Sequence, residues 1–339
     1  DLQLYVVDVE HGQEPKLVKN ISKPSFSPYI DASYYGAALN AGNRSLYAFH
    51  ATAQMPAKKT VFVEIDVDSF EVTQRSKPLE FPELDASSTI LTFDEDLQLI
   101  VMAYTRPQQA VESVGAADAA DADGPALFVY TIDPLTWESI PVGVFAPTNL
   151  PFFTVAGEWT YSQEHHQLAI AAGLANTTHE DYAGVLIDVS LLSGHENSRV
   201  VDGHHTKHAG SVSAKIDAHA FTSHLSIMES LGCMSGSGLN ASVLGFNVTL
   251  NPVGMSLARW NFSELDRVTN IGEWVELNPT SMWSSLFPCD EKENMFVVPM
   301  NVNSTNDGTH FWSFDLQTGQ IFQSQTEFPF YPNTFLFAI

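Results

Sequence analysis

Histidine is concentrated in one segment of this chain. The segment "VVDGHHTKHAGSVSAKIDAHAFTSH" contains five imidazoles, at His204, His205, His208, His219 and His224. His204 and His208 are four residues apart, so one helical turn or a tight loop could bring two imidazoles to one metal ion. The same two residues are candidates for a general base. A solvated polar loop and a loop that gains charge between about pH 7 and pH 5 are alternatives that the pattern leaves open.

Aspartate recurs in a second pattern. The stretches "DASYYGAAL" at Asp31 and "DASSTILTF" at Asp85 each place Asp-Ala-Ser before an apolar run, at the same distance from the next polar turn. Carboxylate oxygens are ligands that Ca²⁺ prefers. Aspartate also opens strands through Asx turns. A metal site and a structural role both fit these residues.

Several other kinds of chemistry are excluded by the sequence. It has no G-x-S-x-G nucleophile motif, no phosphate-binding loop and no dinucleotide fingerprint, so no nucleotide or organic cofactor is expected. Its 15 basic and 40 acidic residues give a net charge of −25, which repels nucleic acids and anionic lipid surfaces. No apolar run reaches the roughly 20 residues that span a bilayer. We therefore expect neither nucleic-acid binding nor membrane insertion.

The elements that must position these residues are predicted to be β-hairpins. Six segments alternate apolar and polar residues on both sides of an Asp or Asn turn, starting at residues 4, 61, 127, 185, 257 and 311. Five of them follow a second hairpin pattern, as in "TILTFDEDLQLIVMAY". Two hairpins make a four-stranded antiparallel sheet, and the period of about 60 residues is typical of a propeller.

Because of this repeated pattern of hairpins, the chain resembles a six-bladed β-propeller. The resemblance implies an all-β fold in which residues 1–339 form a single domain. Pairing of the last run, "NTFLFAI", with the N-terminal hairpin would close the ring. A seven-bladed ring is the alternative, if "VLGFNVTLNPVGM" is an outer hairpin. The resemblance implies that innermost strands converge on a channel. Residues that precede those strands would then ring its mouth as candidate ligands for Ca²⁺ or Zn²⁺: Asp31, Asp85, Asp217, His224 and Asn278.

The resemblance also gives an interpretation of the turns and loops. Propeller ligands usually bind on the face that carries the connections between blades, so the repeated Asp turns, on the other face, are predicted to be structural. The histidine-rich segment is predicted to be such a connection. The acidic stretch "QAVESVGAADAADADGPA" is predicted to join the two hairpins of one blade.

Two further features indicate an exported protein. Seven N-x-S/T sequons are more than chance supplies, and the chain opens on Asp1 as a processed end would. The predicted glycosylation sites are Asn20, Asn43, Asn176, Asn240, Asn247, Asn261 and Asn303. The two cysteines, Cys233 and Cys289, fall in equivalent turns of adjacent blades when "ESLGC" and "SSLFPC" are aligned, which predicts a disulfide between them.

Three hypotheses for function follow. The first is a secreted, acidic, non-catalytic glycoprotein that binds a small molecule, a glycan or a protein partner at its His- and Asp-rich face. The second is an extracellular hydrolase or lactonase that uses a metal at the channel mouth, with His204 or His208 as base. The third is a structural subunit of an extracellular coat or matrix. The sequence does not decide between an enzyme and a binding protein.

Overall fold

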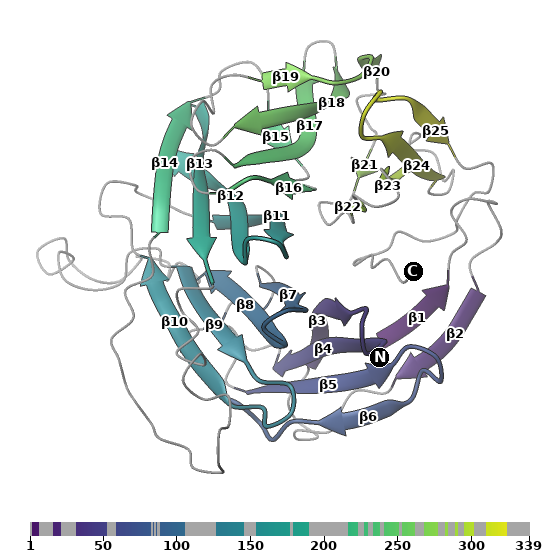
Figure 1. Cartoon of the computed structure of the whole chain (residues 1–339), viewed down its shortest axis with the longest axis vertical. Coiled ribbons are helices and arrows are strands. Elements are labelled where there is room, and N and C mark those ends of the chain that lie inside the picture. Colours follow the sequence, from purple (N-terminus) through teal and green to yellow (C-terminus); the bar gives the residue numbers. More distant parts are fainter. Residues whose placement is uncertain are drawn as a thin grey trace, which may run out of the picture.

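The structure is a computed structural model. It describes twenty segments of the chain: residues 2–6, 16–21, 32–52, 59–82, 84, 86, 89–105, 127–145, 154–176, 179–189, 216–222, 227–229, 233–237, 241–250, 253–261, 268–276, 282–283, 289–290, 295–301 and 310–323. The regular elements of these segments are β-strands, and their sheets stand around a common centre (Figure 1). None of the described elements is a helix long and apolar enough to cross a membrane.

Five antiparallel sheets form the blades of a propeller. Blade 1 runs from the centre outward through β3 (Ala32–Asn40), β4 (Ser45–Thr52), β5 (Thr60–Asp66) and β6 (Val72–Arg75). Blade 2 has β7 (Ile90–Asp94), β8 (Leu99–Thr105), β9 (Leu127–Ile132) and β10 (Ser139–Phe145). Blade 3 has β11 (Thr154–Ser162), β12 (Gln167–Asn176), β13 (His179–Asp188) and β14 (Ile216–Thr222).

Blades 4 and 5 have divided edge strands. In blade 4 the innermost segments are β15 (Ile227–Glu229) and β16 (Met234–Ser235), followed by β17 (Ser242–Leu250), β18 (Val253–Asn261), and β19 (Val268–Asn270) with β20 (Val275–Glu276). Blade 5 has β21 (Met282–Trp283) and β22 (Cys289–Asp290), then β23 (Met295–Asn301), β24 (His310–Asp315) and β25 (Ile321–Gln323). A two-stranded N-terminal sheet pairs β1 (Leu2–Val6) with β2 (Lys16–Ile21).

The predicted propeller architecture is confirmed, but the predicted count of six blades is not. The structure describes five blades and, between blades 5 and 1, the N-terminal sheet (Figure 1). The run "NTFLFAI", which was expected to complete a sixth blade, lies outside the described residues. The seven-blade alternative is wrong in its premise, because β17 and β18 are the two central strands of blade 4 and not an outer hairpin.

The repeated Asp turns are structural, as predicted. In the outer hairpin of blade 2, Asp133 Oδ1 accepts a hydrogen bond from the Leu135 amide at 2.8 Å and Oδ2 accepts one from Thr136 Oγ1 at 2.9 Å. The Asp133 carbonyl accepts from the Trp137 amide at 2.7 Å. The fifth residue of the turn, Trp137, has φ +60°. Asp66 and Asp315 build the same turn with Ser69 and Thr318.

The inner hairpins follow the same rule. Asn40, Asp94 and Ser162 each accept a turn amide at the end of the innermost strand of blades 1, 2 and 3. Four residues later, Arg44, Gln98 and His166 have φ between 51° and 56°. In an antiparallel four-stranded blade, both hairpin turns lie at the same end of the strands. We call this end of the ring the turn face, and the opposite end the mouth face.

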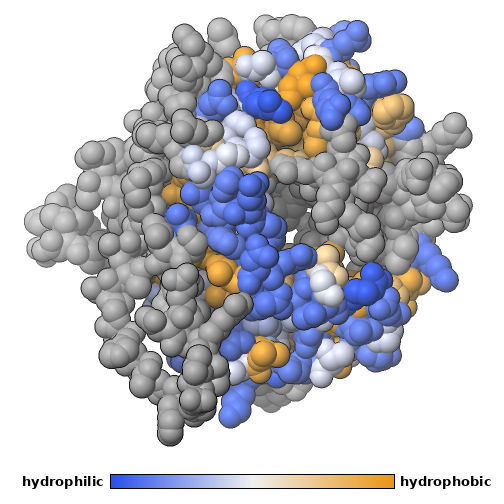
Figure 2. Space-filling view, in the orientation of Figure 1, coloured by the Kyte–Doolittle hydropathy of each residue, from blue (hydrophilic) through white to orange (hydrophobic). Residues whose placement is uncertain are grey.

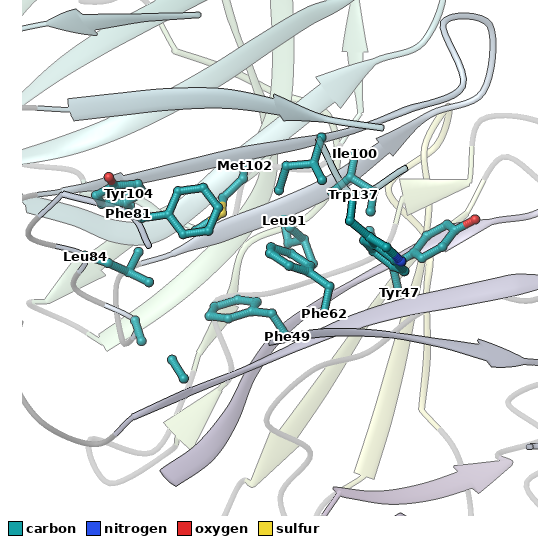
Figure 3. Close-up of a cluster of buried hydrophobic side chains, with 14 of the residues drawn as sticks. Tyr47, Phe49, Phe62, Phe81, Leu84, Leu91, Ile100, Met102, Tyr104 and Trp137 are labelled. Carbon is teal, nitrogen blue, oxygen red and sulfur yellow. The ribbon is translucent and has the colours of Figure 1, made fainter. Parts of the chain in front are cut away.

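The hydrophobic core is divided among the seams between blades. The seam of blades 1 and 2 is filled by aromatic and aliphatic side chains from both sheets, including Phe49, Phe62, Leu91 and Tyr104 (Figure 3). Trp137 stacks on Phe62 with ring centroids 6.0 Å apart. Similar clusters join blades 2 and 3, blades 3 and 4, blades 4 and 5, and blade 1 and the N-terminal sheet. An ion pair from Lys19 to Glu71 adds to the last of these seams.

One outer hairpin differs from the prediction. The sequence predicted that the hairpin starting at residue 185 would be complete before the histidine-rich segment, but β13 pairs instead with β14, which starts at Ile216. In β14, Ile216, Ala218 and Ala220 alternate with polar residues, a pattern that suits an edge strand. Residues 190–215 therefore join two strands of the same blade, and the prediction that the histidine-rich segment connects two blades is wrong for this part of it.

The turn geometry predicts the effect of removing one carboxylate. Asp133→Ala should lower the free energy of unfolding by about 1–2 kcal/mol, because the Leu135 amide and the Thr136 hydroxyl lose their acceptor. Asp133→Asn keeps one acceptor oxygen and should recover most of the loss. Urea unfolding of the three proteins measures this. A loss of less than about 0.5 kcal/mol for Asp133→Ala would contradict the structural role of the turn.

Candidate functional site

The candidate site is the mouth of the channel. Four of the predicted ligands precede the innermost strand of a blade: Asp31 before β3, Asp85 before β7, His224 before β15 and Asn278 before β21. These four residues lie outside the described residues, so the prediction rests on the strands that follow them. The channel is seen in Figure 2 as a recess at the centre of the ring, with hydrophilic residues along the described border on the side in view.

The strands bring the starts of β3 and β7 to one edge. The two strands contact each other, and a Cβ placed on Gly36 of β3 would lie 3.4 Å from Leu91 Cβ of β7. Their following turns also meet, because the Ala41 amide donates to Glu95 Oε1 at 3.0 Å. Since both strands end on the turn face, both begin on the mouth face. Asp31 and Asp85 thus enter adjacent innermost strands from the same face.

Packing holds the approach to β7 in place. The residues on either side of Asp85, Leu84 and Ala86, are 0% and 4% exposed and belong to the seam of blades 1 and 2. The Tyr104 hydroxyl donates to the Pro82 carbonyl at 2.9 Å, and Thr60 bridges to Leu79 in both directions. The connection that carries Asp85 is therefore part of the core on both of its flanks.

Asp217 does not belong with these ligands. The sequence placed it before an innermost strand, but it is the second residue of β14, opposite Leu186. Strand β14 is the outermost strand of blade 3 (Figure 1). This prediction is wrong because the long stretch after Asp188 shifted the register by a whole strand.

The two residues predicted as a base are His204 and His208. Both lie outside the described residues, in the stretch that leaves β13 at Asp188 and returns at Ile216. Those two ends are on the turn face. The role of either histidine as base for a metal at the mouth stays a prediction. His224, which follows β14 and precedes β15, is on the connection that leads to the mouth face.

On the turn face, the structure shows a polar cluster that the sequence did not indicate. Asp94, at the end of β7, is 0% exposed. Its Oδ2 accepts hydrogen bonds from the Tyr161 hydroxyl and, at 2.8 Å, from His166 Nδ1. Its Oδ1 accepts the amides of Asp96 and Leu97 at 3.0 and 2.8 Å. Four donors thus satisfy one buried carboxylate, and two of them come from blade 3.

Burial and charge control the protonation of Tyr161. Desolvation raises the pKa of its hydroxyl far above the ordinary value, and the negative charge of Asp94 raises it further. The phenol therefore stays protonated and remains a donor to Asp94. The backbone of His166 is in the left-handed region, with φ +51°, and its carbonyl accepts a hydrogen bond from the Val189 amide at 2.8 Å.

Neighbouring turns extend this cluster around the ring. The Glu95 amide donates to Gln163 Oε1 at 2.9 Å, and Gln163 Nε2 donates to the Phe93 carbonyl at 2.6 Å. With the bond from Ala41 to Glu95, blades 1, 2 and 3 are tied together at their inner turns. These side chains and amides form hydrogen bonds between blades, so we infer that the cluster stabilises the fold. No group of three or more His, Cys, Asp or Glu side chains suited to a metal occurs among the residues that the structure describes.

The predicted glycosylation sites differ in accessibility. Asn20, Asn43 and Asn261 are exposed. Asn247 is half-buried within β17, and its Nδ2 donates to Asn270 Oδ1 at 3.1 Å. Asn176 is the last residue of β12, and Asn240 and Asn303 lie outside the described residues.

The two cysteines lie at corresponding places in adjacent blades. Cys233 precedes β16 and is 7% exposed, and Cys289 opens β22, so both belong to innermost strands next to the inner turn. Cys233 packs in the seam with Phe296 of blade 5. It faces the blade that carries Cys289.

Comparisons with known proteins find similarity in fold but none in sequence. No family model and no curated protein matches the sequence. Among solved structures, the chain is similar to a periplasmic gluconolactonase of Pseudomonas aeruginosa, with 10% identity, TM-score 0.47 and coverage of 96% of this chain and 92% of the other. An oligogalacturonate lyase in complex with manganese gives 8% identity, TM-score 0.46 and coverage of 95% and 72%.

Other similar structures are longer proteins. A Hadza microbial sialidase gives 10% identity, TM-score 0.49 and coverage of 85% of this chain and 57% of the other. The chain spans 27% of the tricorn protease chain and 34% of a prolyl oligopeptidase from Galerina marginata, to which it is also similar. These likenesses do not extend to substrate or mechanism.

The Asp94 cluster gives a prediction on stability. Asp94→Ala should cost about 3–5 kcal/mol of unfolding free energy, because Tyr161, His166 and two amides lose a buried charged acceptor. Asp96→Ala, on the same turn but exposed, is the matched control and should stay within about 0.5 kcal/mol of the parent. Chemical denaturation of both variants measures the difference. Equal stabilities would show that the cluster does not hold blades 2 and 3 together.

Proposed function

We propose that this chain is a propeller hydrolase that uses a divalent cation at the mouth of its channel to cleave an ester or lactone. The observation that carries the proposal is the place of Asp31, Asp85, His224 and Asn278 in the chain. Each precedes the innermost strand of a different blade, Asp31 directly and the other three within a few residues. Residues far apart in sequence are thus directed to one mouth by the order of the strands.

The donor set suits a hard cation. Two carboxylates and one amide carbonyl supply oxygen ligands of the type that Ca²⁺ binds, and one imidazole adds a nitrogen that Zn²⁺ or Mn²⁺ also accepts. The two carboxylates would hold the positive charge, and the surplus of 25 negative charges over the whole chain favours cation binding. Bound there, the cation would polarise the carbonyl group of the substrate.

The chain's own residues have separate tasks in this proposal. Asp31 and Asp85 fix the position of the cation because their connections run into rigid innermost strands. Asn278 adds a neutral oxygen without adding charge. His224 would add one ring nitrogen as a ligand, and His204 or His208 would be the base that takes a proton from water. The substrate would be small, since it must reach a channel mouth.

The turn face supports the proposal by elimination. The carboxylates of Asp66, Asp133 and Asp315 are used in turns, and that of Asp94 is used between blades. Chemistry at those residues would have to break the bonds that form the fold. On the mouth face, side chains that are not needed for turns are available to bind a ligand.

The metal and the activity can be tested together. Elemental analysis of the purified chain should find about one Ca²⁺, Mn²⁺ or Zn²⁺ per molecule, removable with EDTA. The chain should hydrolyse δ-valerolactone or p-nitrophenyl acetate, and EDTA should abolish this. Asp31→Asn and Asp85→Asn should each weaken binding of the metal roughly tenfold or more. Asp96→Asn, an acidic residue on the turn face, is the control and should change neither.

A metal-free protein whose melting temperature is unchanged by EDTA would refute the proposal. The chain would then fit the other functions expected from its sequence, a non-catalytic protein that binds a small molecule, a glycan or a protein partner, or a subunit of an extracellular coat. Binding of the metal without hydrolysis of either substrate would refute the proposed enzymatic activity.

We further propose that the chain is an exported glycoprotein whose N- and C-terminal segments together form a sixth blade. The N-terminal sheet supports this because it occupies a sector between blades 5 and 1 and packs on blade 1 through Ile21 (Figure 1). The exposure of Asn20, Asn43 and Asn261 supports glycosylation at these three sites.

A disulfide between Cys233 and Cys289 is the remaining part of this proposal. Its support is the burial of Cys233 against blade 5 and the place of Cys289 on that blade. Titration of thiols under denaturing, non-reducing conditions should find none. Reduction should lower the melting temperature, because the bond would join two sheets across a seam. Two titratable thiols in the freshly purified protein would refute the disulfide.

A further inference from the structure

One buried tyrosine reaches the connection between blades 1 and 2. Tyr104 is the last residue but one of β8, at the mouth end of that strand, and it is 0% exposed. Its hydroxyl donates a hydrogen bond to the Pro82 carbonyl at 2.9 Å. Pro82 belongs to the connection that leaves β6 and enters β7, three residues before Asp85. The bond therefore joins a strand of blade 2 to the segment that carries a candidate ligand.

Neighbouring rings hold the phenol of Tyr104 in place. It stacks on Phe128, its cross-strand partner in β9, with ring centroids 5.2 Å apart. Tyr130 stacks on it at 6.0 Å, and Phe81 of the connection meets it edge to face at 6.3 Å. Tyr104 and Phe81 lie together at one end of the buried cluster in Figure 3. Because three rings fix the phenol, its hydroxyl is a donor of fixed position.

The bond controls an angle that the apolar packing of the connection leaves open. Phe81, Leu84 and Ala86 are at most 4% exposed, so they anchor the connection in the seam of blades 1 and 2. Hydrophobic burial is non-directional, however, and does not orient a peptide group. At Pro82 the ring limits φ, and the bond from Tyr104 to the carbonyl limits ψ. The direction in which the chain continues toward Asp85 is thereby set.

Such a constraint matters for a metal ligand. A side chain on a loosely held connection loses conformational entropy when it binds a cation, and this loss weakens the affinity. Groups that orient the ligands of a metal therefore change its affinity although they do not touch it.

We propose that Tyr104 is a positioning residue for the cation at the channel mouth and that it acts through Asp85. This inference rests on the proposed function, because it requires a metal at that place. The Tyr104 hydroxyl holds the Pro82 carbonyl, and the connection then presents Asp85 in one direction. Asp31 reaches the mouth on a different connection and does not depend on this bond.

Metal titration of the full chain tests the proposal. The protein is freed of metal with EDTA, dialysed, and titrated with Ca²⁺, Mn²⁺ and Zn²⁺ in a calorimeter. For the metal that the parent binds, Tyr104→Phe should weaken the affinity about threefold to tenfold, the range that one net hydrogen bond supplies. Hydrogen–deuterium exchange of the metal-free variant should be faster than in the parent over residues 79–89.

Two control variants separate positioning from stability. Tyr130→Phe removes a hydroxyl from the same aromatic stack, and this hydroxyl makes no hydrogen bond within the described residues. Ile100→Val trims a fully buried side chain of the same cluster on β8 and should lower the melting temperature. Both controls should bind the metal as the parent does. Tyr104→Phe keeps its ring and should melt within a few degrees of the parent.

Double variants test whether Tyr104 acts through Asp85. In an Asp85→Asn background, Tyr104→Phe should have little further effect on the affinity for the metal. In an Asp31→Asn background, it should still cost the full threefold to tenfold. Mutations that share one path are non-additive, whereas independent ones add.

Several results would overturn the proposal. One is an affinity that Tyr104→Phe leaves unchanged in a parent that binds metal, and this result would leave the proposed function intact. Others are equal further losses in the two double variants, a loss as large in Ile100→Val, or unchanged exchange over residues 79–89. A parent that binds none of the three metals would refute the proposed function, and this inference with it.

Discussion

In blades 1 and 2 the strand next to the innermost one is buried on both of its faces, and this is the constraint on which the rest of the structure depends. In β4 and β8 each residue is buried, so neither face of these strands can meet water. A sheet of this kind is stable only between two neighbours. The seams satisfy this condition one after another, from the N-terminal sheet through blade 5. A ring is the arrangement in which no blade lacks a neighbour.

The ring gives its two ends different roles. Hairpin turns gather on one end, where side chains such as Asp133 and Asp94 bond the backbone or the next blade. The innermost strands begin on the other end, and Asp31 and Asp85 precede two of these strands, β3 and β7, in the chain. Blade 4 also has two buried polar atoms, Asn247 Oδ1 and Ser256 Oγ, that have no hydrogen-bond partner among the described residues.

Most of the fold could be predicted from local patterns. The hairpins around Asp66, Asp133 and Asp315 could be predicted because apolar and polar residues alternate on both sides of a turn that opens with Asp. Strand β14 was missed because the turn before it is replaced by a long stretch with no such spacing. That error placed Asp217 before an innermost strand, whereas it lies in the outermost strand of blade 3. The contact of Asp94 with Tyr161 and His166 could not be predicted, since it joins residues about 70 positions apart that meet only when two blades pack.

The central claim is that the mouth face binds a cation and that the turn face only holds the fold. Hydrogen–deuterium exchange with and without Ca²⁺ tests it most directly, because it locates the effect along the chain. The account predicts slower exchange for peptides that span Asp31 and Asp85, and unchanged exchange for the turns at Asp66, Asp133 and Asp315. Unchanged exchange throughout, or protection confined to the turns, would contradict it.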